Sequence, residues 1–175
     1  MTLWKVDPAH TDVQFSVRHL MIAKVRGAFT EFSGTLKGDP HDLEKASLHF
    51  SIDTSSITTN QAQRDEHLKS ADFFDVATYP EITFDSQSIE SVGQGTYNVK
   101  GALTMKGVTN TMTFTVTMLG EAISPMDGST VASLHAEGAI DRRAYGMTWQ
   151  QALDKGGVVV SNEVDVTIDV EITKQ

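Results

Sequence analysis

Apolar residues recur at every second position through much of the chain. The clearest runs are at 13–17, 48–52, 112–118 and 164–172. Because successive side chains of a β-strand point to opposite faces, this spacing gives each strand one apolar and one polar face. That pattern is typical of antiparallel sheets, whereas buried parallel strands are continuously apolar. The sequence therefore predicts an all-β protein of about eight sequential antiparallel strands.

Short groups of turn-forming residues separate the runs. Glycine, proline and asparagine supply the backbone angles that tight connections need. The predicted turns are Gly38-Asp39-Pro40, 92–95, 107–110, 125–128 and Gly156-Gly157, with Ser161-Asn162 as the last hairpin because asparagine tolerates the left-handed conformation.

One segment breaks the strand pattern. Residues 60–71 lack β-branched side chains and are rich in helix formers, with Asn60 available as the N-cap and Asp65 four residues before Lys69. The sequence predicts one short helix there. The adjacent aromatics of Phe73-Phe74 cannot share one face of a strand, so we expect them to pack beside the helix at an opening of the barrel or at a sheet edge.

The architecture is either a sandwich or a closed barrel. Phe29 and Phe32 are three residues apart and are flanked by Gly27 and Gly34, which predicts a bulge or sharp bend of the kind that curves a long strand into a barrel. A single barrel domain over residues 1–175 is expected. Eight strands enclose an interior that side chains fill or that holds one small ligand, and the pattern leaves both open.

Composition excludes several function classes. The chain has no cysteine, so disulfides, thiolate metal sites and cysteine nucleophiles are absent. Its net charge of −9 argues against nucleic-acid binding. No apolar run resembles a signal peptide or a membrane span, so a cytoplasmic location is expected, or a periplasmic or secreted one if a signal segment has been removed.

Enzyme and metal motifs are also missing from the sequence. There is no G-x-S-x-G elbow, no G-x-x-x-x-G-K-[ST] loop and no H-E-x-x-H. The six histidines show no i, i+4 pair and no H-x-H spacing. We therefore expect no metal, no cofactor and no catalytic residues.

Three groups of basic residues have both a plain and a functional interpretation. Residues 14–30 contain three basic side chains and no acid, which fits a solvated loop edge or a site for an anionic headgroup. Arg64 and His67 share a helix face and would form surface pairs or a polar lid. If Arg142 and Arg143 lie in a strand, at most one faces inward, and a buried arginine needs an acid, a carbonyl or an anionic ligand.

Six segments, taken in order, carry a resemblance to a known family. They are W-x-V-D-x-x-H-T-x-V-x-F-S-V-R-H-L at 4–20, G-x-F-x-x-F-S-G at 27–34, R-D-E-H-L-K-S-A-D-F-F-D-V at 64–76, Y-P-E-I-T-F at 79–84, G-A-L-T-M-K-G-V-T at 101–109 and D-R-R-A-Y-G-M at 141–147. On these motifs the chain resembles the YceI-like family of polyisoprenoid-binding proteins. The resemblance implies an extended lipocalin-like barrel that holds a long isoprenoid or other amphiphilic lipid, often as a homodimer, without catalysis.

The resemblance also implies a ligand site with an apolar and a polar part. The expected apolar lining is Phe15, Val17, Phe29, Phe32, Phe50, Phe84, Leu103, Phe114, Met118 and Trp149. The headgroup candidates are Arg18, His19, Arg64, His67 and Arg142. The chain departs from the family pattern at Asp141, where asparagine is usual, and an acid there could neutralise the adjacent arginine. The segment 161–163 also departs from it.

Two other functions fit the same residues. The first is a carrier of a fatty acid, a fatty amide or a quinone, which the resemblance does not separate from an isoprenoid carrier. The second is an enzyme that uses the barrel as a substrate pocket, with His67 or His19 as the base and Tyr145 as the acid. The sequence shows no paired nucleophile and base for such a reaction.

Overall fold

Antiparallel strands make up most of the molecule. The computed structural model describes residues 1–20, 22–150 and 160–175. The elements, in chain order, are β1 (Leu3–Val6), the 3₁₀ helix η1 (Pro8–His10), β2 (Asp12–His19), β3 (Ala23–Phe29), β4 (Phe32–Asp39), β5 (Asp42–Asp53), the 3₁₀ helix η2 (Thr54–Ser56), β6 (Ile57–Thr58), α1 (Ala62–Lys69), β7 (Glu81–Gly93), β8 (Thr96–Met105), β9 (Val108–Ile123), β10 (Thr130–Asp141), the 3₁₀ helix η3 (Arg142–Tyr145) and β11 (Glu163–Lys174). Among these described elements, no helix has the length and hydropathy needed to cross a bilayer.

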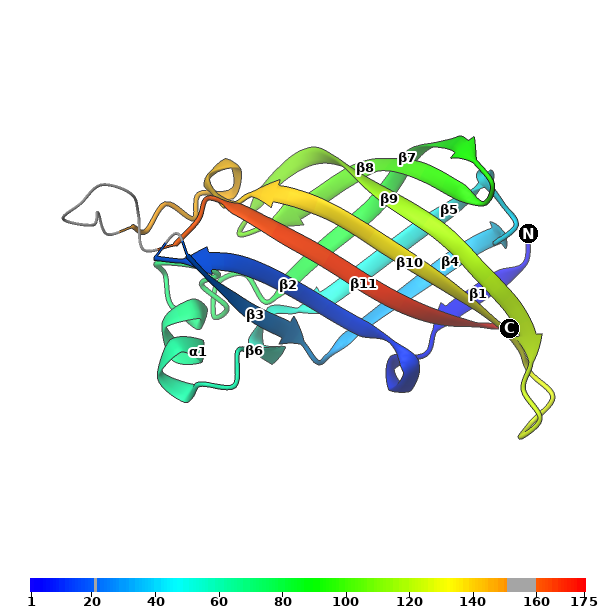
Figure 1. Ribbon diagram of the computed structural model, residues 1–175, viewed down its shortest axis with the longest axis horizontal. Helices are drawn as coiled ribbons and strands as arrows, with labels where there is room; N and C mark the ends of the chain where they lie inside the picture. The colour runs from blue at the N-terminus through cyan, green and yellow to red at the C-terminus, as the bar shows by residue number, and fades with distance from the viewer. Residues whose placement is uncertain (21, 151–159) are drawn as a thin grey trace.

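Eight of the strands form a closed ring (Figure 1). Their order is β1-β4-β5-β7-β8-β9-β10-β11, and β1 then pairs with β11 to complete the barrel. β11 shares its second edge between two partners, because residues 165–169 pair with β2 and residues 172–174 pair with β1. β2 extends the sheet to β3 and β6. The predicted fold class is confirmed.

The predicted bend between Phe29 and Phe32 is a complete interruption of the strand. β3 ends at Phe29 and β4 begins at Phe32, and each strand pairs with different neighbours. Gly27 lies under the ring of Phe15, where a Cβ atom would overlap the ring. Gly34 is covered in the same way by Phe50. Both glycines therefore allow an aromatic ring to lie flat against the backbone.

The short helix is present, but its cap differs from the prediction. Gln61, not Asn60, is the N-cap of α1, and its side chain accepts a hydrogen bond from the backbone N–H of Arg64 at 2.5 Å. Asn60 has φ +61°, a left-handed conformation that asparagine tolerates, so it forms the turn before the helix. Phe73 follows α1 and is buried at 6% exposure, as expected for a residue packed beside the helix.

The last connection of the barrel also differs from the prediction. β10 and β11 pair along their length, yet residues 142–162 join them, so Ser161-Asn162 is not a two-residue hairpin. Arg142 and Arg143 belong to η3 and not to a strand. The predicted turn at Gly156-Gly157 lies outside the described residues.

The two ends of the barrel are built differently. At one end Leu43 is fully buried, and the side chains of Trp4 and Tyr97 donate hydrogen bonds to the backbone oxygens of Gly38 and His41 at 3.2 and 3.1 Å. These bonds hold the β4–β5 turn across that end, which is called the closed end below. The other end carries α1, the β2–β3 turn and η3 (Figure 1).

We expect Gly101→Ala to destabilise the barrel. A Cβ atom at Gly101 would overlap the backbone oxygen of Asp85 and approach the ring of Phe84. The free energy of unfolding, measured by urea denaturation, should fall by about 1–3 kcal/mol. Gly120→Ala is the matched control, since nothing lies within 4 Å of its Cβ position. Equal effects of the two substitutions would contradict the close packing described for Gly101.

Candidate functional site

The barrel encloses a cavity of about 400 Å³. Volumes of about 300–1,000 Å³ are typical of pockets that bind small molecules. Its lining is predominantly apolar and comes from most strands of the ring. The lining residues are Val6, Val13, Gln14, Phe15, Val17, Arg18, His19, Val25, Phe29, Thr35, Leu36, Leu48, His49, Phe50, Ile52, Thr59, Arg64, His67, Leu68, Phe73, Phe74, Ile82, Phe84, Val99, Leu103, Met105, Phe114, Val116, Leu134, Ala136, Ile140, Arg142, Met147, Trp149, Val160, Val164, Val166, Ile168, Val170 and Ile172.

The strand β11 shows how the sequence pattern produces a hollow interior. Its apolar residues Val164, Val166 and Ile168 line the cavity, while Asp165 and Asp169 between and beyond them are exposed on the outside. These inward side chains are partly buried, and Val166 and Ile168 pack against the core clusters on one side and border the cavity on the other. Of the two interiors left open by the sequence, the structure has the one with room for a ligand.

Most of the apolar residues expected at the site lie on the cavity wall. Those that line it are Phe15, Val17, Phe29, Phe50, Phe84, Leu103, Phe114 and Trp149. Phe32 is not part of the lining, because its ring stacks on Phe50 with centroids 5.8 Å apart. Met118 is also outside the lining and packs against the buried cluster of Trp4 and Leu36, beside a β-bulge in the pairing of β9 with β10. The bulge begins beyond the Met118–Leu134 pair, so Met118 keeps the inward face that the alternation predicts but packs in the buried cluster and not on the cavity wall.

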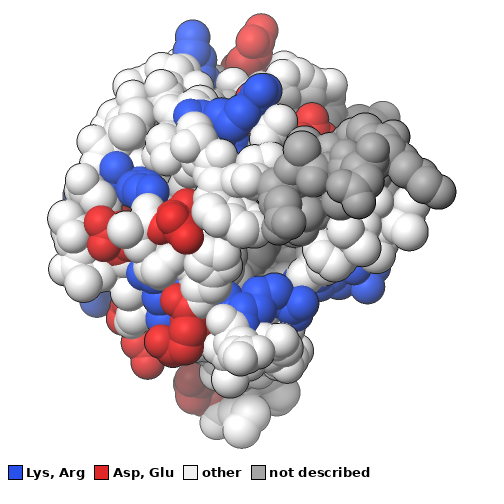
Figure 2. Space-filling view, turned by 90° about the vertical axis from the view of Figure 1, so that its left-hand side faces the viewer, with Lys and Arg blue, Asp and Glu red and all other residues white. Residues whose placement is uncertain are grey.

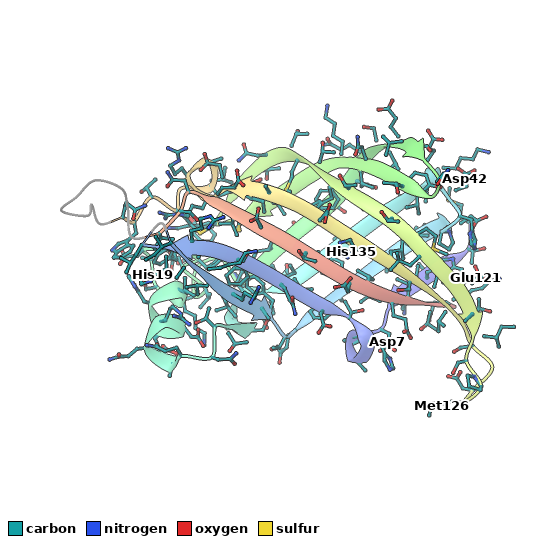
Figure 3. All side chains as sticks on the ribbon, in the orientation of Figure 1. Asp7, His19, Asp42, Glu121, Met126 and His135 are labelled. Atoms are coloured by element: carbon teal, nitrogen blue, oxygen red, sulfur yellow. The ribbon has the colours of Figure 1, made fainter. Side chains whose placement is uncertain are left out.

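All five headgroup candidates line the cavity at the same end. We call this group, Arg18, His19, Arg64, His67 and Arg142, the mouth. They come from the end of β2, from α1 and from η3, which are far apart in the sequence. Figure 3 shows His19 at this end and Asp42, Glu121 and Met126 at the opposite end. The structure places these side chains together, and their contact with a ligand stays a prediction.

Arg142 is the most deeply buried member of the mouth, at 3% exposure. Its Nε donates to the backbone oxygen of Ser161 at 3.1 Å and its Nη1 donates to that of Met147 at 2.8 Å. Its guanidinium carbon lies 5.9 Å from the centre of the Phe73 ring. Within the described part of the chain, Nη2 is buried and has no hydrogen-bond partner. Burial disfavours the charged guanidinium, so desolvation lowers the pKa of Arg142.

The acid next to Arg142 does not form an ion pair with it. Asp141 accepts hydrogen bonds from Nε and Nη2 of Arg143 at 3.0 and 2.7 Å. These bonds hold the pKa of the Asp141 carboxyl below its usual value. Asp141, where the chain departs from the family pattern, therefore pairs with Arg143, and among the described residues no carboxylate forms an ion pair with Arg142.

Arg64 and His67 already have partners on the protein. Arg64 donates from Nε and Nη2 to the side-chain and backbone oxygens of Thr59 at 2.7 and 2.8 Å. His67 Nε2 lies 2.9 Å from a carboxylate oxygen of Asp72. The His67 ring also packs edge-on against Trp149, with centroids 4.9 Å apart. The surface pairing predicted for this helix face is therefore present, and both side chains also line the cavity, while their role as a polar lid stays a prediction.

Two further groups bear on catalysis and metal binding. Tyr145 is buried, its pKa is raised by desolvation, and it lies outside the cavity lining, so it is not positioned to act as an acid beside His67. In the described ranges, one cluster has metal-ligand geometry: Asp7, His10 and Glu171 on the outer surface. A hydrogen bond to the Asp7 carboxylate raises the pKa of His10, so a proton competes with a metal ion for this ring.

Comparisons with known proteins agree with this geometry. A model described as the YceI-like domain matches residues 4–172. A UPF0312 protein of Staphylococcus aureus is 38% identical over 173 residues, which cover 99% of this chain and 98% of that protein. BcnA of Burkholderia cenocepacia has a similar structure with a TM-score of 0.82 and 28% identity, covering 95% of this chain and 98% of BcnA.

Two more solved structures share the fold. A YCEI protein of Campylobacter jejuni matches with a TM-score of 0.77 and 29% identity, covering 97% of this chain and 96% of that protein. A polyisoprenoid binding domain from Saccharophagus degradans matches with a TM-score of 0.74 at 15% identity, covering 98% of both chains. At that identity the second match shows the fold alone.

The hollow interior predicts opposite effects for one substitution at two positions of β10. Ala136 borders the cavity and Ala132 is packed in the buried cluster at 1% exposure. Ala136→Leu should leave the free energy of unfolding unchanged or raise it by about 1 kcal/mol, because the added carbons fill open space. Ala132→Leu should lower it by about 1–3 kcal/mol through overpacking.

Urea denaturation of the two variants measures both changes. A similar loss of stability in Ala136→Leu and Ala132→Leu would mean that the interior near Ala136 is filled in solution.

Proposed function

The chain belongs to the YceI-like family, and we propose that it holds a long-chain isoprenoid or a similar amphiphilic lipid inside its barrel, for storage or transport and without catalysing a reaction. One observation carries the proposal: an apolar cavity opens toward a buried arginine that has an unsatisfied N–H donor.

The apolar wall supplies the driving force for binding. Each methylene moved from water to an apolar environment contributes about 0.8 kcal/mol, so a chain of many carbons binds by desolvation alone. The aromatic side chains Phe15, Phe29, Phe50 and Phe84 offer large surfaces without hydrogen-bonding groups. Such a wall selects a ligand by its length and width more than by its chemistry.

The polar mouth supplies the preference for a headgroup. A buried donor without a partner costs free energy, which a ligand recovers by accepting that hydrogen bond. The N–H groups of a guanidinium match the oxygens of a phosphate in geometry and charge. Arg142 is therefore the residue that we expect to bind the headgroup most strongly. Arg18, His19, Arg64 and His67 surround the same opening and would add further contacts.

Arg142 also favours anionic headgroups among the alternative ligands. A phosphate or a carboxylate accepts the free N–H of Arg142 with charge assistance, so a phosphorylated isoprenoid or a fatty acid fits better than a fatty amide or a quinone. The barrel shared with the polyisoprenoid binding domain of Saccharophagus degradans supports an isoprenoid, since that architecture accommodates one there. An enzymatic role has less support, because Tyr145 does not border the cavity. A homodimer remains an expectation from the family resemblance.

Replacing Arg142 should separate headgroup binding from chain binding. In Arg142→Met the affinity for a polyprenyl phosphate should fall by about tenfold or more, the usual value of a hydrogen bond to a charged group. The affinity for the corresponding polyprenol, which lacks the phosphate, should stay the same. Arg143→Met is the matched control, since Arg143 is exposed and pairs with Asp141. Titration by intrinsic fluorescence or calorimetry measures the affinities of wild type and both variants for the two ligands.

Several results would count against the proposal. Equal phosphate affinity in wild type and Arg142→Met would remove Arg142 from the site. Loss of both ligands in Arg142→Met would indicate a structural role for the residue. No uptake of either ligand by the wild-type protein, and no lipid extracted from it, would refute the carrier function.

A further inference from the structure

The turn between β2 and β3 exposes apolar side chains beside the mouth. Leu20 is 41% exposed and Ile22 is 83% exposed. The turn follows Arg18 and His19 directly, so its apolar tip lies next to the opening of the cavity. Leu20 and Ile22 therefore present apolar surface to the solvent beside the mouth.

The same hairpin is positively charged. Arg18, Lys24 and Arg26 are exposed, and residues 14–30 contain no acid although the whole chain carries a net charge of −9. None of these three cations has a salt-bridge partner in the described part of the molecule. Figure 2 views this end, where Lys and Arg side chains lie beside a hollow in the surface.

The acids of the neighbouring helix segment are engaged with local partners. Asp65 accepts hydrogen bonds from Thr59, and Asp72 lies 2.9 Å from His67. Glu66 lies 3.7 Å from the amino group of Lys69. Among the described residues, these three acids therefore pair locally and not with the cations of the β2–β3 hairpin.

We propose that the β2–β3 hairpin docks the mouth of the barrel onto an anionic lipid bilayer. Leu20 and Ile22 enter the interfacial region, and Lys24 and Arg26 lie against the lipid phosphates. An apolar tip flanked by cations is the arrangement by which peripheral proteins bind such surfaces. The inference builds on the proposed function, because docking brings the cavity to a membrane lipid without exposing its chain to water, at about 0.8 kcal/mol per methylene.

Charge and size favour a bilayer over a protein partner. Two apolar side chains are far too few for a stable protein interface, which buries about 1,200–2,000 Å². A second copy of the chain would bring two hairpins of like charge together. The β9–β10 hairpin at the opposite end also exposes Ile123 and Met126, but the acids Glu121 and Asp127 lie among them. That hairpin would be repelled by an anionic surface and serves as an internal control.

The test measures sedimentation of the full chain with vesicles. One set consists of phosphatidylcholine, and the other contains equal parts of phosphatidylcholine and phosphatidylglycerol. We expect binding to the anionic set, weakened by added salt. Lys24→Glu should lower the partition coefficient by at least about tenfold, since each basic side chain near the surface contributes about fivefold. Ile22→Ser should lower it by at least about fourfold, the equivalent of one buried methylene.

Matched controls distinguish docking from general effects. Lys100→Glu makes the same charge change at an exposed position on β8, and Ile123→Ser makes the same apolar change at the opposite end, where the side chain is 71% exposed. Both controls should bind vesicles as the wild type does. All four variants should bind a soluble short-chain prenyl phosphate with unchanged affinity, because their side chains lie outside the cavity lining.

The outcomes separate this inference from the proposed function. Equal sedimentation with the two vesicle sets, or equal losses in the variants and their controls, would overturn docking while leaving the carrier function untouched. Failure to bind the prenyl phosphate alongside normal vesicle binding would refute the carrier function alone.

Discussion

The four-residue strand β1 closes the barrel. Its two edges pair with β4 and with the end of β11, and without it both strands would present unpaired backbone groups to solvent. Closure also determines the interior. A ring of eight strands has room inside for side chains or for one small ligand, and here the inward apolar side chains leave a cavity of about 400 Å³.

The two ends of this ring differ in how their polar groups are hydrogen-bonded. At the closed end, Trp4 and Tyr97 donate hydrogen bonds to the β4–β5 turn and bind it across the barrel. The mouth instead carries basic side chains from β2, α1 and η3. Among the described residues, the buried Nη2 of Arg142 has no hydrogen-bond partner. A buried donor without a partner costs free energy, which a ligand at this opening would recover under the proposed function. The asymmetry gives the cavity one polar opening.

Sequence reasoning located the strands more reliably than the connections. The alternation in β11 predicted its inward face correctly, because period two is a direct consequence of strand geometry. The alternation also gave Met118 its inward face, but it could not show that this side chain packs in the buried cluster and not on the cavity wall. Sequence reasoning also predicted a hairpin turn at Ser161-Asn162, since nothing local shows that η3 follows β10 or that Ser161 hydrogen-bonds to Arg18 of β2.

The sequence by itself determined the antiparallel strands, the apolar face of each, the short helix and the family, because these follow from local periodicity and from motifs. Only the tertiary structure decided that the interior is hollow, that Arg18, Arg64 and Arg142 meet at one opening, and that Asp141 pairs with Arg143. Those properties depend on distances between segments far apart in the chain. Barrel closure sets these distances, and no local pattern of residues encodes them.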